Sequence, residues 1–126
     1  MRCLTTRVLT HDEVGAFDVE PYEINWGVLL NDVPVACCRA EIDGAGGLWV
    51  HANVHRHTLR PRETAAYAKA FCERLLKYGF KRLRTQVDSG NRTALRLVRV
   101  LGFVEIERND QDVVLNYGRI NEETAV

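Results

Sequence analysis

The stretch "NRTALRLVRVLGF", residues 91–103, combines an amphipathic helix with an abrupt end. Its apolar positions recur at intervals of three and four residues, which places them on one helical face: Ala94, Leu95, Val98 and Leu101. Gly102 follows, and a glycine in a left-handed conformation commonly ends a helix. The stretch therefore predicts a helix that packs on a core, followed by a strand at "FVEIER".

A longer helix is predicted upstream, from Glu63 to Tyr78, with Gly79 at its end. Its apolar positions keep the same spacing: Ala68, Phe71, Cys72, Leu75 and Tyr78. Between the two helices, "RLRTQV" alternates as a strand does. The middle of the chain is therefore predicted to run helix, strand, helix, strand.

The first 54 residues are predicted to be mostly strands. "RCLTTRVLT" is one, followed by a short helix that begins near Thr10. "NWGVLLND" and "VPVACCRAEI" form a hairpin that continues into "GLWVHANV", and Cys37 and Cys38 would face opposite sides of their strand. With a last strand at "DVVLNYGRI", the chain is predicted to be an α/β protein with a mixed sheet.

Composition limits the possible classes. The 126 residues suit a single domain, 1–126, with a polar tail over residues 120–126. Lys plus Arg and Asp plus Glu are equal at 17 each, so the whole chain has no electrostatic preference for nucleic acid or an anionic membrane. We find no signal sequence, apolar span or CxxC spacing, and expect a reduced cytoplasmic protein.

The segment over residues 47–106 resembles the core of the GNAT superfamily of N-acetyltransferases. The most specific part is residues 91–103, in which a family pattern is matched by Asn91, Ala94, Leu95, Leu97, Leu101, Gly102 and Phe103. The resemblance implies a GNAT-like fold: a mostly antiparallel central sheet, flanked by helices, with a V-shaped splay between strands 4 and 5. It also implies that acetyl-CoA would bind along strand 4, with contacts from Ala52, Asn53, Val54 and Asn91.

The turn before the longer helix departs from the family pattern. In the family, this turn is rich in glycine and its amides hold the CoA pyrophosphate, whereas Arg60 and Arg62 occupy the glycine positions here. Pro61 also lacks an amide donor. Two outcomes stay open: Arg60 and Arg62 bind the phosphates through their guanidinium groups, with Thr64 as a helix cap, or their bulk blocks the site.

The catalytic positions depart as well. Many family members protonate the leaving thiolate with a tyrosine where this chain has Val98, so water or Cys72 would have to substitute. His51 and His55 are the candidate general bases because histidine titrates near neutral pH. The alternation of His51, His55 and His57 also permits a metal site, but surface or structural roles are commoner at such spacing, and we expect no metal.

Two functional hypotheses follow. Gly90 and Asn91, with the chain length, add a looser resemblance to small phage-encoded GNAT-like proteins such as internal virion protein A. We favour a protein of that type, located in the host cytoplasm or a virion, that binds a protein partner instead of catalysing acetyl transfer. The basic stripe Arg92, Arg96 and Arg99 is the candidate partner surface. The alternative is an active, divergent acetyl-CoA-dependent N-acetyltransferase.

Overall fold

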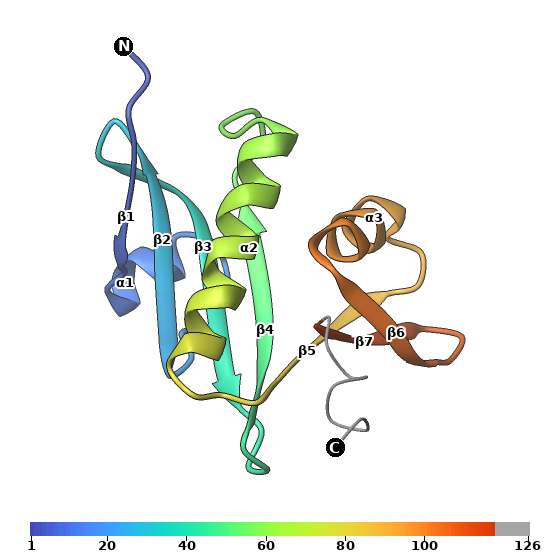
Figure 1. The fold of residues 1–126 in the computed structure, drawn as a ribbon. Coiled ribbons are helices and arrows are strands. Elements are labelled where there is room, and N and C mark those ends of the chain that lie inside the picture. The colour runs from blue at the N-terminus through green and yellow to red at the C-terminus, as the bar shows by residue number, and fades with distance from the viewer. Residues whose placement is uncertain (118–126) are drawn as a thin grey trace.

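The computed structural model describes residues 1–117, in which three helices flank one seven-stranded sheet (Figure 1). The strands are β1 (Leu4–Val8), β2 (Ile24–Leu30), β3 (Val33–Ile42), β4 (Gly47–Val54), β5 (Arg82–Asp88), β6 (Phe103–Arg108) and β7 (Asp112–Tyr117). The helices are α1 (His11–Gly15), α2 (Pro61–Lys77) and α3 (Arg92–Leu101). The predicted mixed α/β class is confirmed. The predicted polar tail, 120–126, lies outside the described residues.

The sheet has the strand order β1-β2-β3-β4-β5-β7-β6. The predicted meander of β2, β3 and β4 is present, and every neighbouring pair is antiparallel except β4 and β5, which are parallel. That parallel pairing covers only Gly47–Trp49 on β4 and Arg82–Arg84 on β5. Beyond it the two strands separate, as Figure 1 shows, so the splay expected between strands 4 and 5 divides the sheet into a four-stranded and a three-stranded part.

Both predicted long helices form, with boundaries close to those expected. α3 begins after Asn91, whose Oδ1 accepts a hydrogen bond from the Ala94 amide at 3.1 Å, and ends at Gly102 with φ 109°. α2 starts two residues earlier than predicted, because Pro61 occupies its first turn, where the absence of an amide hydrogen costs little. The predicted cap, Thr64, was wrong: the helix is already under way there, and the Thr64 amide donates to the Arg60 carbonyl at 3.0 Å.

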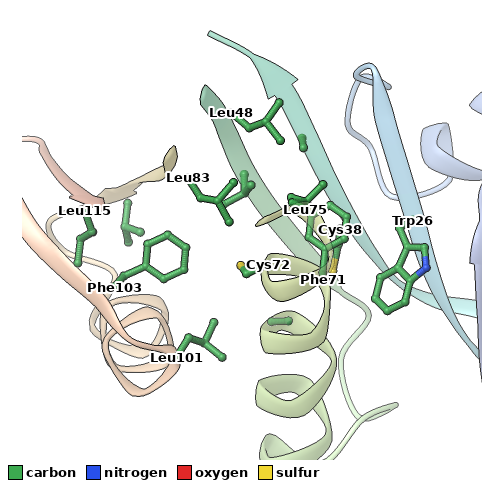
Figure 2. Close-up of a cluster of buried hydrophobic side chains, with 14 of the residues drawn as sticks. Trp26, Cys38, Leu48, Phe71, Cys72, Leu75, Leu83, Leu101, Phe103 and Leu115 are labelled. Atoms are coloured by element: carbon green, nitrogen blue, oxygen red, sulfur yellow. The ribbon is translucent and has the colours of Figure 1, made fainter. Parts of the chain in front are cut away.

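The main core lies between the sheet and the pair α2 and α3. Figure 2 shows Phe71, Cys72 and Leu75 of α2 among side chains from both parts of the sheet. On the opposite face, α1 buries Val14 against Leu9 and Cys37. Cys37 and Cys38 therefore face opposite sides of β3, as the alternation predicted.

A buried carboxylate fixes the start of the parallel pairing. The Asp43 side chain, only 1% exposed, accepts hydrogen bonds from the Ala45 and Gly47 amides and from the Arg84 guanidinium at 2.9 Å. Hydrogen bonds from those amides, more than the nearby charges of Arg82 and Arg84, hold the Asp43 pKa at about 2. This turn thereby joins β4 to β5 at the vertex of the splay.

Candidate functional site

The splay leaves one edge of β4 open. The Val50 carbonyl accepts a hydrogen bond from Thr85 Oγ1 at 2.8 Å, one residue beyond the paired part of β4 and β5. The His55 amide donates in the other direction, to the Val35 carbonyl of β3. Because backbone groups alternate in direction along a strand, those of Ala52 and Val54 point into the splay and those of Asn53 point toward β3. This strand edge is the place where the sequence predicted a pantetheine contact.

Behind this edge lies a small apolar cavity of about 50 Å³. Its lining comes from both parts of the sheet and from both long helices: Cys38, Val50, His51, Ala52, Ala68, Phe71, Cys72, Thr85, Leu97, Val98, Leu101 and Phe103. Val98 lies where the family resemblance would place a phenol, and a valine side chain has no proton to donate. The cavity differs from the polar pocket that an amine-acylating site would need.

The thiols in this cavity are poor substitutes for the missing phenol. Burial raises the pKa of Cys72 to about 12 and raises that of Cys38 further. A group with such a high pKa holds its proton too firmly to neutralise a more acidic leaving thiolate efficiently. Cys72 therefore does not fit the role of general acid that the sequence left open for it.

The two candidate bases lie in different surroundings. His51 lines the splay cavity, is half-buried, and its ring centroid lies 5.6 Å from that of Tyr22. Burial, with the positive charge of Arg39 as a second cause, lowers the His51 pKa, so the imidazole is neutral near neutral pH. His55 is exposed past the end of β4, stacked on Phe17 at 4.2 Å, and does not line the splay cavity.

The turn before α2 contains an internal anion. Glu63 Oε1 accepts a hydrogen bond from the Arg60 amide at 2.8 Å, across the first turn of the helix. An arginine side chain has no acceptor, so this is the one-sided equivalent of a capping box. With Pro61 lacking an amide hydrogen, two of the backbone groups that a phosphate would use at this helix end are therefore occupied or missing.

The N-terminal segment reinforces this arrangement. Arg2 forms an ion pair with the Glu63 carboxylate and also donates to the Thr58 carbonyl at 2.9 Å. The hydrogen bond from Arg2, followed by that from the Arg60 amide, lowers the Glu63 pKa. Glu63 is therefore an anion held in the turn by two donors, one of them 61 residues away in sequence.

Sequence reasoning missed both Glu63 and Arg2. The usual signal for such a cap is a serine or threonine followed three residues later by a glutamate, and Arg60 at the cap position obscures it. Arg2 has no local signal at all, because its role depends on β1 lying near the start of α2. Only the tertiary structure brings the two side chains together.

A larger groove, of about 580 Å³, separates the start of α2 from α3. It is lined by Leu59, Pro61, Arg62, Thr64, Ala65, Thr93, Arg96, Leu97 and Val100. Arg62 and Thr64 therefore lie on the groove that the family resemblance would assign to a nucleotide, whereas Arg60 is the helix cap beside it. Asn91 uses its side-chain oxygen to cap α3.

The predicted basic stripe is present on α3, but its three arginines differ in whether they form an ion pair. Arg92, Arg96 and Arg99 line a second, outer hollow beside Val100. Arg99 forms an ion pair with Glu105 at 3.2 Å, while Arg92 and Arg96 have no ion pair within residues 1–117. The unpaired positive charge is therefore concentrated on the α2-facing side of the stripe, at Arg96, and near the start of α3, at Arg92.

Within residues 1–117, no group of three or more His, Cys, Asp or Glu side chains is arranged to hold a metal ion. Over the same residues, no helix is long and apolar enough to cross a membrane.

The turn offers a pyrophosphate few free donors. The Arg60 amide is bonded to Glu63, Pro61 contributes no donor, and the Glu63 carboxylate would repel a phosphate placed there. The unpaired guanidinium groups of Arg62 and Arg96 are suitable phosphate ligands, but they lie along the groove and not in the turn. Two of the four backbone amides at this helix end are therefore unavailable to a phosphate, whereas those of Arg62 and Glu63 take part in no hydrogen bond within residues 1–117.

Comparison with known proteins gives a consistent result for the fold. The E. coli ribosomal-protein-S18-alanine N-acetyltransferase superposes with a TM-score of 0.73 at 18% identity, covering 91% of this chain and 93% of that one. The GNAT domain of S. lividans PAT superposes with a TM-score of 0.69 at 17% identity, covering 86% of this chain and 69% of that one. A chain of the NatC complex bound to Gag peptide and CoA superposes with a TM-score of 0.69 at 13% identity, covering 92% of this chain and 98% of that one.

No protein-family model and no curated protein matches the sequence. The architecture nevertheless agrees with these structures over most of the chain, including the parallel pairing of β4 and β5 where the sheet splays. The chain therefore has the fold of the GNAT N-acetyltransferases.

Proposed function

We propose that this protein is a GNAT-fold binding protein that acts through a protein partner and does not transfer acetyl groups. The observation that carries the proposal is the Glu63 carboxylate bonded to the Arg60 amide, because it places a fixed negative charge where the family's cofactor would bring its own. The looser resemblance to small phage-encoded proteins extends the proposal to a partner in a virion or a host cell.

The splay cavity supports the same function. Its volume is about 50 Å³, its lining is largely apolar, and Val98 and the high-pKa thiol of Cys72 occupy the places from which a proton would be donated. General acid catalysis needs a group whose pKa lies near the working pH. The loss of two amides at the helix end weakens the binding of an acetyl donor, and the loss of the acid removes the proton source for its chemistry.

Acetyl transfer can be tested directly on the purified protein. The assay follows thiol release from acetyl-CoA at about 1 mM, a concentration that would reveal even weak donor binding, with primary amines and N-terminal peptides as acceptors. The proposal predicts a rate equal to that without protein. Thiol release that depends on both the protein and an acceptor would overturn it.

A second candidate function, a divergent N-acetyltransferase, is supported by two observations. The open β4 edge at Ala52 and Val54 continues toward the groove with Arg62, and a neutral His51 lines the splay cavity as a potential proton acceptor. For this candidate, thiol release should fall when His51 is replaced by Gln. An unchanged rate in His51→Gln would exclude His51 as the base.

A further inference from the structure

The groove between α2 and α3 has an apolar floor and a positively charged rim. Pro61 and Ala65 on α2 face Leu97 and Val100 on α3 across a volume of about 580 Å³. Val100 is 71% exposed and continues this apolar floor to the surface. Exposed apolar side chains beside a groove often mark a surface that another molecule covers.

The rim carries arginines whose charge the protein does not neutralise. Within residues 1–117, the guanidinium groups of Arg62 and Arg96 take part in no hydrogen bond, ion pair or ring contact. The neighbouring acid, Glu63, is already paired with Arg2. The groove therefore presents net positive charge although the whole chain has a formal net charge of zero.

We propose that this groove binds an acidic amphipathic helix of a partner protein. The inference rests on the proposed function, for which it names the partner's chemistry. Apolar side chains of the partner helix, spaced at three and four residues, contact Leu97 and Val100. Carboxylates on its flanks pair with Arg62 on one side of the groove and with Arg96 on the other.

The groove suits such a helix better than it suits phosphate groups. Thr93, Arg96, Leu97 and Val100 lie at positions one, four, five and eight of a single α3 face, which gives an apolar and basic strip about two helical turns long. A phosphate would leave Val100 exposed, and the Glu63 carboxylate, bonded to the Arg60 amide, would repel it at the turn. An acidic helix covers the apolar floor and neutralises the rim together.

A peptide library can test the predicted chemistry without assuming a partner. Random peptides of about 16 residues, long enough for four helical turns, are selected on the immobilised full-length protein. The enriched peptides should carry several Asp or Glu residues beside apolar residues at helical spacing. Their affinity should fall about tenfold or more in an Arg62→Glu, Arg96→Glu variant, and should fall as salt rises from about 50 to about 300 mM.

A matched control separates the groove from general surface charge. Lys77→Glu, Lys81→Glu makes the same change of charge at the opposite end of α2, and should leave peptide affinity unchanged within about twofold. Val100→Asp should weaken binding by adding a negative charge and removing the apolar contact. Circular dichroism of each variant establishes that the fold is intact.

Several outcomes would overturn the inference: no enriched peptides, enrichment of basic or purely apolar peptides, or equal binding to the Arg62→Glu, Arg96→Glu variant. Tighter binding of a DNA duplex than of the selected peptides would assign the surface to nucleic acid and overturn it as well. Displacement of the peptides by micromolar coenzyme A would assign the groove to a nucleotide. Acetyl transfer with peptide binding intact would instead refute the proposed function and leave the docking surface in place.

Discussion

The Glu63 carboxylate accepts a hydrogen bond from the Arg60 amide at 2.8 Å, across the first turn of α2. In a helix this amide would otherwise be free to bind an external anion. Arg2 holds the same carboxylate from the N-terminal segment. Glu63 therefore occupies one of the amides that the fold would offer to a phosphate and places its own negative charge beside the others.

The cap of α3 gives a prediction about Asn91. Replacing Asn91 by Ala removes the hydrogen bond to the Ala94 amide and should lower the free energy of unfolding by about 1 kcal/mol. Urea denaturation measures the change, and Asn91→Asp should keep most of the stability because aspartate is an equally good cap. A stable Asn91→Ala variant would mean that the side chain serves something other than the helix.

Asp43 gives a prediction about pH. Its folded-state pKa of about 2 lies below the ordinary value of 3.8, so its ionised form contributes stability that is present above about pH 4 and is lost as pH falls toward 2. Asp43→Asn leaves Arg82 and Arg84 without their carboxylate and should cost about 3 kcal/mol near neutral pH.

Urea denaturation of the Asp43 variant at several pH values checks this. The difference in the free energy of unfolding between the variant and the wild-type protein should shrink as pH falls from about 4 to about 2, because the wild-type Asp43 carboxylate also becomes neutral there. Asp110→Asn, an exposed change in the β6–β7 turn, is the control and should be nearly neutral. An equal cost at every pH would show that the Asp43 charge has no part in the stability.

The cysteines give a prediction about access to the splay. Cys3 is exposed, whereas Cys37, Cys38 and Cys72 are buried and burial raises the pKa of each. In the native protein, a thiol reagent near neutral pH should therefore modify one thiol quickly and the other three only on unfolding. Rapid modification of Cys72 in the folded protein would indicate an open splay, contrary to the small cavity described above.

Much of the fold was predictable from the sequence because its signals are local. The spacing of Leu95, Val98 and Leu101, with Gly102 behind them, specifies α3 and its end. The alternation that separates Cys37 from Cys38 likewise specifies the two faces of β3. The start of α2 was placed too late because Pro61 favours a first helical turn where the apolar pattern has not yet begun.

The site was less predictable because it depends on distant contacts. The departures from the family pattern at Arg60, Arg62 and Val98 were visible, but their consequence was open between arginines that bind phosphate and arginines that block it. The structure adds a third feature, the pairing of Arg2 with Glu63, which no local pattern encodes. The roles of His51 and His55 as bases stay predictions.

The small volume of the splay cavity gives a prediction about substitutions that enlarge Val98. Val98→Tyr would restore the phenol of the family pattern, but a cavity of about 50 Å³ is too small for the added ring, so we expect a loss of about 1–3 kcal/mol in stability and no acetyl transfer. Val98→Ile, a smaller increase, should cost less. Acetyl transfer gained by Val98→Tyr would contradict the proposal, because it would show that the helix end still binds the acetyl donor.

The most direct test of the central claim is a calorimetric titration of the wild-type protein and of Glu63→Gln with coenzyme A. Glu73→Gln, on the same helix but away from the turn, is the matched control. We predict no binding at about 1 mM for the wild-type and control proteins, and affinity at least about tenfold higher for Glu63→Gln, because the neutral side chain no longer repels phosphate and no longer neutralises Arg2. Micromolar binding by the wild-type protein, unchanged in Glu63→Gln, would contradict the claim that Glu63 fills the anion site.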